Sequence, residues 1–310
     1  MKQFLIKVTI ISLPILFGAL FMEFLLRNTP NDYLFKKQYL DKNSAEIETL
    51  ILGSSHSFYG FNPEYFSSNT FNASHISQSL NYDYEILKKY KDQFKNLKTI
   101  ILPISYFTLF GKLEAGSESW RVKNYIIYYD LNSSKSLTDY SEVLSNRIDV
   151  NIKRIVSYYV LGNSTISCTK LGWGTNYNSQ NARDLIASGK TAAQRHTIDN
   201  VNSDKYQEIF NENRLILNSI IKWCAKNNVN VLLLTPPAFE TYRQNLNQEQ
   251  LKITVNTTRN ICSKYDNCIY YNLLSDTNFV ATDFYDADHL SEIGAKKLSV
   301  LINQKIVEWK

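Results

Sequence analysis

A serine, a histidine and an aspartate stand where they could form a nucleophilic site. The segment 49–52 is an apolar run of strand type that stops at Gly53, so Ser55 is delivered onto a tight turn. Near the other end, Asp286 and His289 lie three residues apart, just before the last predicted helix. A serine hydroxyl is a weak nucleophile that needs an imidazole to take its proton and a carboxylate to orient that imidazole. The chain offers one candidate for each role.

The same residues also have a purely structural interpretation. The Gly53 turn could do no more than end a strand, and Asp288 or Ser291 could simply cap the helix after His289. We favour the catalytic interpretation because the two segments lie at opposite ends of an alternating pattern of strands and helices.

Five apolar segments alternate with segments of helical periodicity. The predicted strands are residues 48–52, 70–73, 98–104, 229–235 and 268–273, and the main helices cover about 82–97, 206–224, 251–265 and 291–309. This alternation predicts an α/β fold, a flavodoxin-like three-layer sandwich around a parallel five-stranded sheet. Sites in such sheets form at the carboxyl ends of the strands, where the serine turn and the histidine loop would both lie.

The two motifs resemble the first and last sequence blocks of the SGNH (GDSL-like) hydrolase superfamily. In that family the serine follows Gly-x, and an Asp-x-x-His spacing closes the catalytic triad. The resemblance implies that Ser55, Asp286 and His289 are the catalytic residues of a serine esterase or acyltransferase, with no cofactor.

The oxyanion hole of this family is not clearly present in the chain. The family pattern has a glycine in its second block and an asparagine in its third, which stabilise the oxyanion together with the N–H of the serine. Here Ser77 stands where the glycine is usual, and residues 102–106 contain no Gly-x-Asn. The candidate oxyanion donors are therefore Ser55, Ser77 and Gln78.

A divergent group of membrane-anchored SGNH-like proteins shares this departure. These proteins assist the O-acylation of exported polymers, as in alginate acetylation and teichoic acid D-alanylation. The resemblance rests on the anchor, the serine turn, the Asp-x-x-His spacing and a mid-chain insertion. It implies bacterial acyl transfer, with acetyl as the first candidate, to a cell-surface polysaccharide, or ester hydrolysis on one, with a membrane-bound O-acyltransferase as partner. The competing class is a catalytically inactive, membrane-tethered binding or assembly protein on the SGNH scaffold.

The first residues predict an uncleaved membrane anchor, residues 1–27. After Lys2 and Lys7, the run Val8–Leu26 is interrupted by a single charge near its end, and about 20 apolar residues suffice to cross a bilayer. No small-x-small cleavage site with a convincing polar flank follows. The lysines favour a cytoplasmic amino terminus. We therefore expect a single-pass protein of the inner membrane whose α/β domain, residues 28–310, faces the periplasm or the outside.

A long segment, about residues 105–204, interrupts the alternation after the third strand and is rich in Tyr, Asn and Ser. One helix is predicted within it, over about 138–161. An insertion at this edge of the sheet could form a lid or a substrate surface. Side chains in it could stack on sugars or hold an anionic group, although burial in a small core of the insertion's own is the more common fate of Trp and Tyr. These candidates are Trp120, Arg121, Trp173, Tyr177 and His196.

Composition and motif spacing exclude several other classes. The net charge of +5 is mild and unclustered, so nucleic acid is not an expected partner, and 44% hydrophobic residues suits a globular domain. His56, His75 and His289 could bind a metal with nearby acids. We predict no metal site because paired histidines at helical spacing and a dense carboxylate cluster are both missing from the sequence.

The four cysteines leave the disulfide pairing open. Cys262 and Cys268 are close enough to be bridged at a helix-to-strand corner in an oxidising compartment. The position of Cys224 on the apolar face of a predicted helix indicates a core residue. A bridge between Cys168 and Cys224 is the other possibility, without geometric support from the sequence.

Overall fold

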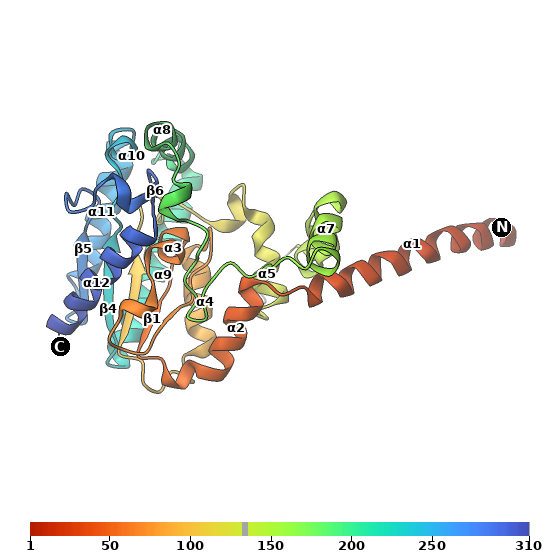
Figure 1. Cartoon of the computed structure of the whole chain (residues 1–310), viewed down its shortest axis with the longest axis horizontal. Coiled ribbons are helices and arrows are strands. Elements are labelled where there is room, and N and C mark those ends of the chain that lie inside the picture. The colour runs from red at the N-terminus through yellow and green to blue at the C-terminus, as the bar shows by residue number, and fades with distance from the viewer. Residues whose placement is uncertain (132–135, 310) are drawn as a thin grey trace. The chain divides into compact units, whose positions relative to one another are not determined.

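A computed structural model of the chain describes residues 1–131 and 136–309, which form two compact units (Figure 1). Unit 1 comprises Met1–Gln38 and Ser117–Ser167, and unit 2 comprises Tyr39–Gly116 and Cys168–Lys310. The segment predicted as an insertion, residues 105–204, is therefore divided between the two units.

Unit 2 is an α/β fold around a parallel five-stranded sheet. The strand order is β2-β1-β3-β4-β5, and every neighbouring pair is parallel, which is the flavodoxin-like order. The predicted fold class is confirmed. The strands are β1 (Thr49–Ile51), β2 (Thr70–Asn72), β3 (Thr99–Pro103), β4 (Asn230–Thr235) and β5 (Cys268–Asn272).

Helices pack on the sheet and on one another. Helix α12 contacts α3, whereas α9 contacts both α4 and α11. One apolar core joins alternate strand residues, such as Ile51 and Ile101, to Leu298 and Ile302 of α12. The helices are α3 (Ser55–Gly60), α4 (Leu80–Tyr90), α9 (Asp204–Lys226), α11 (Gln248–Cys262) and α12 (Glu292–Glu308).

Several elements of unit 2, among them two strands and two helices, do not appear among the sequence predictions. A two-stranded antiparallel hairpin, β6 (Phe284–Asp286) and β7 (His289–Leu290), follows β5. Helix α8 (Leu185–His196) packs against α10 (Glu240–Gln244). The hairpin and α8 lie beside each other and shape the site described below.

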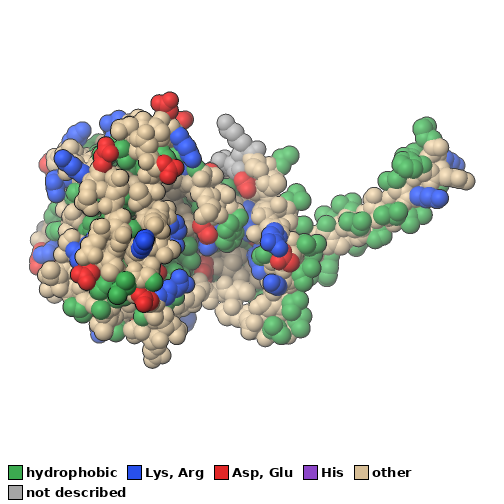
Figure 2. Space-filling model, turned by 90° about the horizontal axis from the view of Figure 1, so that it is seen from above, with side chains coloured by type: hydrophobic (Ala, Val, Ile, Leu, Met, Phe, Trp, Pro, Cys, Tyr) green, Lys and Arg blue, Asp and Glu red, His purple; other side chains and the backbone are tan. Residues whose placement is uncertain are grey.

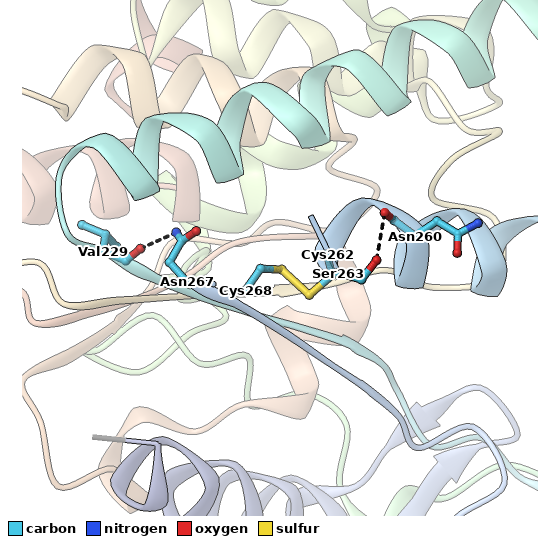
Figure 3. Close-up of a disulfide and its surroundings, with 6 residues drawn as sticks. All are labelled: Val229, Asn260, Cys262, Ser263, Asn267 and Cys268. Atoms are coloured by element: carbon cyan, nitrogen blue, oxygen red, sulfur yellow. Dashed lines mark hydrogen bonds between the residues drawn. A yellow bond between two sulfur atoms is a disulfide. The ribbon is translucent and has the colours of Figure 1, made fainter. Parts of the chain in front are cut away.

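The cysteine pair at the corner between α11 and β5 is bridged (Figure 3). The Cys262–Cys268 disulfide joins the last residue of the helix to the first residue of the strand, as the spacing predicts. Cys224 is a free thiol buried on α9, so the alternative bridge to Cys168 is not formed. Burial raises the pKa of the Cys224 thiol, which makes it an inert part of the core.

Unit 1 contains the long apolar helix α1 (Lys2–Asn28), whose hydrophobic side chains are exposed along its length (Figure 2). By length and composition, α1 is able to cross a membrane. The unit also contains α5 (Val122–Ile127), and α2 (Asp32–Asn43) begins in it.

The single helix predicted over 138–161 is wrong. Four short elements take its place: a 3₁₀ turn (Leu137–Tyr140), α6 (Glu142–Ser145), α7 (Ile148–Ile155) and a π-helical turn (Val156–Val160). The chain is extended at Ser141, which caps α6 by accepting the N–H of Leu144, and again at Asn146. The Ser141 side chain, which takes a backbone N–H, thus marks the break before α6, and the extended backbone at Asn146 marks the break after it.

Candidate active site

The turn after β1 is held open by a glycine and a buried acid. Gly53 has φ +111°, and a Cβ there would lie 2.5 Å from Ser57 Oγ, so the position requires glycine. Its N–H donates to Asp83 Oδ1 at 2.7 Å. The chain then enters α3, so that Ser55 is the first residue of a helix and its N–H has no carbonyl partner within that helix.

Ser55, His289 and Asp286 lie in a hydrogen-bonded row. Ser55 Oγ is 2.8 Å from His289 Nε2, and His289 Nδ1 is 2.9 Å from Asp286 Oδ1. The histidine and the aspartate are both buried, while Ser55 is partly exposed. The structure therefore brings together the three residues that the sequence proposes as nucleophile, base and acid, in the order that such chemistry needs.

The β6–β7 hairpin fixes the orientation of His289. Asp286 Oδ1 accepts the backbone N–H of His289 at 2.9 Å and that of Asp288 at 3.2 Å, besides the imidazole. Just beyond the hairpin, a Cβ on Gly294 would lie 2.1 Å from the carbonyl of Asp283, so glycine allows α12 to begin directly against it. Ser291 caps that helix, as the structural interpretation of the sequence supposes, without excluding the site.

Asp288 is a second buried carboxylate beside the imidazole. Its Oδ1 lies 3.4 Å from His289 Nδ1, farther than the hydrogen-bonded Asp286. Its Oδ2 lies 3.5 Å from His56 Nε2 and 3.6 Å from His196 Nδ1. His56 also contacts Ser105 Oγ through Nδ1, at 2.6 Å. Asp288 is thus the charged centre of a three-histidine cluster.

The two carboxylates control the protonation of His289. Burial by itself would lower the pKa of its imidazole, but the charges of Asp288 and Asp286 outweigh burial and raise that pKa to about 10. Burial lowers the pKa of His56, and it lowers the pKa of His196 to about 3. The cluster therefore favours one imidazolium, at His289, and keeps its neighbours neutral.

The two backbone N–H groups proposed as oxyanion donors are available. Ser77 has φ +59°, a conformation typical of glycine, which fits its place in the second sequence block. Across residues 1–131 and 136–309, we find no hydrogen-bond acceptor for the N–H of Ser55 or Ser77. The two loops lie side by side because the N–H of His75 donates to the carbonyl of Gly53 at 3.3 Å.

The Gln78 side chain has a different partner from the one proposed for it. Its amide donates to Asp83 Oδ1 at 2.6 Å, the same oxygen that accepts from Gly53, and Gln78 is almost fully buried. Gln78 is therefore joined to the serine turn through Asp83, and its role as an oxyanion donor stays a sequence-based prediction. The role of Asp83 could not be predicted, because this residue lies within α4 and is distant in sequence from both motifs.

We expect Asp83→Asn to remove a pH-dependent destabilisation. Burial raises the pKa of Asp83 to about 7, despite hydrogen bonds from Gln78 and Gly53 that favour its charged form. The pKa of Asp83 is higher in the folded chain than in the unfolded chain. Protonated Asp83 therefore stabilises the fold at low pH, and this stabilisation is lost as the pH rises through 7. The difference from 3.8 amounts to at most about 4 kcal/mol. Asparagine retains an acceptor oxygen.

Chemical denaturation from pH 4 to pH 9 tests this expectation. The free energy of unfolding of the wild type should fall relative to that of Asp83→Asn across the range. A constant difference between the two proteins would show that Asp83 does not titrate in it.

An aromatic stack forms one wall beside His289. The Tyr177 ring lies between Tyr59 and Tyr285, with ring centroids 3.7 and 3.9 Å away, and its edge meets the imidazole at 5.2 Å. The indole N–H of Trp173 donates to the carbonyl of Tyr59 at 2.8 Å. Tyr177 and Trp173 therefore belong to the wall of the site, and their aromatic neighbours are residues of unit 2.

A cavity of about 300 Å³ adjoins the acid side of the triad. It is lined by Asp286 and Asp288 of the hairpin and by Arg183, Ser188 and Arg195 from α8 and the residues before it. His196, the last residue of α8, lies beside this cavity, with its Nδ1 2.9 Å from Tyr242 Oη and 3.6 Å from Asp288 Oδ2. With Asp184 also in its lining, the cavity carries two arginines and three aspartates, and Arg195 lies 3.7 Å from Asp288 Oδ2.

Trp120 and Arg121, the other proposed substrate residues, belong to unit 1. The Arg121 guanidinium lies over the Trp120 ring, 4.3 Å from its centroid, and is 2.5 Å from Glu118. The indole lines a cavity of about 450 Å³ together with Tyr33 and Lys123. These contacts lie within unit 1, so a role in substrate binding remains a sequence-based prediction.

His56, Asp288 and His289 also place possible metal ligands within 4.8 Å of one another. Both ring nitrogens of His289 already have partners in Ser55 and Asp286, and this leaves a metal only His56 Nε2 and Asp288. Two ligands fall short of the three that catalytic zinc sites take from the protein. We expect EDTA to leave ester turnover unchanged. Loss of turnover that zinc restores would instead assign the cluster to a metal.

The comparisons with known proteins identify no family. No family model matches the chain, and no curated protein matches it. Among solved structures, the chain is similar to "a putative platelet activating factor from Streptococcus pneumonia", with 14% sequence identity and a TM-score of 0.44, over 96% of this chain and 98% of that one. A similarity at this level assigns neither fold nor function.

Proposed function

We propose that the protein is a serine-dependent enzyme of acyl-ester chemistry. One observation carries the proposal: Ser55 Oγ, both nitrogens of His289 and Asp286 Oδ1 form a continuous row with spacings of 2.8 and 2.9 Å. A turn at the end of a strand and a nearby histidine do not by themselves indicate catalysis. A buried carboxylate aligned behind the imidazole does, because it serves the proton transfer. It holds the tautomer that accepts the serine proton and stabilises the imidazolium that forms.

The reaction follows from these positions. His289 Nε2 takes the proton of Ser55 as Oγ attacks the acyl carbonyl, and the new oxyanion lies against the N–H groups of Ser55 and Ser77. The imidazolium returns the proton to the leaving oxygen as the ester bond breaks, leaving an acyl group on Ser55. Water or a sugar hydroxyl then gives its proton to His289 and attacks the acyl carbonyl. As the acyl–Oγ bond breaks, the imidazolium returns this proton to Ser55 Oγ, which restores Ser55 and neutral His289.

We further propose that the acceptor or substrate is an exported cell-surface polysaccharide, with acetyl as the first candidate for the acyl group. The membrane-compatible helix α1 supports an anchored enzyme with unit 2 outside the cytoplasm. Beside His289, the edge of the tyrosine stack and the mixed arginines and aspartates of the adjoining cavity offer aromatic contact and hydrogen-bonding groups to a sugar. A membrane-bound O-acyltransferase that brings acyl groups across the bilayer would be the partner.

The experiment compares cells that lack the protein after complementation with wild type, Ser55→Ala or the matched control Ser54→Ala. We expect wild type and Ser54→Ala, but not Ser55→Ala, to restore the acyl-ester pattern of the surface polysaccharide. A reporter fused after the last residue should be active only outside the cytoplasm, and recovery of the full-length protein in the soluble fraction would contradict the anchor.

One observation favours a second candidate, a catalytically inactive, membrane-tethered binding or assembly protein. The family's third-block asparagine is missing, and the hydroxyl that follows β3, Ser105 Oγ, is held by His56 at 2.6 Å. This class predicts that Ser55→Ala complements as well as wild type.

A further inference from the structure

Unit 1 exposes many apolar side chains in one short segment. Among the exposed side chains of the 3₁₀ turn, α6, α7 and the π-helical turn, Leu144 is 65%, Ile148 66% and Val160 71% accessible. Others in the same segment are Leu137, Tyr140, Val150, Ile152, Val156, Tyr159 and Leu161. Soluble surfaces rarely concentrate apolar groups in this way unless something covers them. We call residues 137–161 the apolar segment.

The apolar segment is tied to the last turns of α1 (Figure 1). The Glu23 carboxylate accepts the Ser141 hydroxyl and the N–H groups of Glu142 and Val143, at 2.7 to 3.0 Å, and so holds the start of α6. Arg27 donates to the carbonyl of Tyr140 at 2.5 Å. All of these contacts lie within unit 1, so the depth of α1 in a bilayer also sets the depth of the apolar segment.

Helix α1 places that attachment at the membrane boundary. Its 27 residues extend about 40 Å, whereas the hydrocarbon core of a bilayer is about 30 Å thick. With Lys2 and Lys7 at one face, Glu23 and Arg27 reach the other boundary. Tyrosine and apolar side chains with nearby basic groups are typical of helices that lie in this layer. Tyr159 donates to the carbonyl of Leu25, and Lys153 is exposed on α7.

We propose that the apolar segment lies in the outer headgroup layer of the bilayer, with its exposed side chains inserted among the lipids beside α1. The inference rests on α1 being the membrane anchor of the proposed function. Beyond that function, the inference means that unit 1 contacts the membrane through the apolar segment as well as through α1. The occupant of the apolar surface is lipid, since α1 already brings it to that depth.

Photolabelling in lipid vesicles that contain no other protein tests the proposal. The full-length chain is reconstituted into phosphatidylethanolamine and phosphatidylglycerol vesicles that contain a lipid with a diazirine in its acyl chain, and labelled peptides are mapped by mass spectrometry. We expect label on α1 and on residues 137–161, and background label on α11 of unit 2. The quadruple variant Leu144→Gln, Ile148→Gln, Val160→Gln, Leu161→Gln should lose the label on the segment and keep the label on α1.

The control carries the same kind of change in unit 2, at Leu215→Gln and Val307→Gln, two exposed positions that should leave both labels in place. Label on α1 without label on the segment would overturn the proposal and leave the anchor standing. Absence of label from both would overturn the anchor and the proposal together. Label on the segment in native membranes but not in vesicles would also overturn it, in favour of a protein partner.

Discussion

Replacing Ser55 with alanine is expected to reduce turnover of an activated acetyl ester by a factor on the order of 10⁴ to 10⁶. The removal of a serine nucleophile in a Ser-His-Asp triad has an effect of this size, because the covalent route is lost and only binding and oxyanion stabilisation remain. The fold should not change, since Ser55 is the first residue of α3 and, among the residues that the structure describes, its hydroxyl has His289 as its one hydrogen-bond partner.

Ser54→Ala is the matched control for this substitution. Ser54 is buried, directly precedes the nucleophile, and its side chain makes no capping hydrogen bond to α3. We expect it to retain activity within a few fold. Steady-state kinetics of the three purified full-length proteins in detergent make the comparison. Equal losses in Ser54→Ala and Ser55→Ala would indicate damage to the turn instead of removal of a nucleophile.

The second large effect is a difference in activity between the variants Asp286→Asn and Asp288→Asn. Asp286→Asn is expected to lower kcat by a factor on the order of 10³ to 10⁴, because an amide at this position no longer holds the imidazole tautomer that accepts the serine proton. Asp288→Asn keeps the Asp286 hydrogen bond to His289 and removes only the nearby charge. It should therefore act mainly on the pH dependence.

The sign of that pH effect follows from the base that the reaction needs. Only neutral His289 accepts a proton, and the carboxylates raise its pKa to about 10, so kcat/KM of the wild type should still rise as the pH increases above 7. Without the Asp288 charge the pKa of His289 falls, and the rising limb should move to lower pH. Profiles of kcat/KM from pH 5 to 10 for both variants provide the measurement. A limb that moves with Asp286→Asn but not with Asp288→Asn would contradict the assignment.

The strands could be predicted because their sequences leave few alternatives. Short, nearly continuous apolar runs such as 49–52 and 229–235 are typical of strands buried on both faces, and the structure places β1 and β4 within them. Periodicity located α9, α11 and α12 equally well. It failed over 138–161, because the apolar spacing there continues through residues whose backbone is extended, and spacing alone does not register a cap at Ser141.

The candidate site could be predicted only where one residue type at a fixed spacing carries the chemistry. Ser55, Asp286 and His289 meet this condition. Asp288, Asp83 and Ser105 do not, because their roles arise from tertiary contacts: Asp288 between three imidazoles, Asp83 under the Gly53 turn, and Ser105 on His56. The hairpin that carries His289 is also too short to show a strand pattern.

Detection of an acyl group on Ser55 is the most direct test of the central claim. The full-length protein is mixed with an activated acetyl ester, quenched rapidly in acid, and analysed by intact mass and by peptide mapping. We predict one acetyl group per chain on the peptide that contains Ser55, and its absence from Ser55→Ala. An acetyl group located elsewhere, or turnover that Ser55→Ala leaves unchanged, would contradict the account.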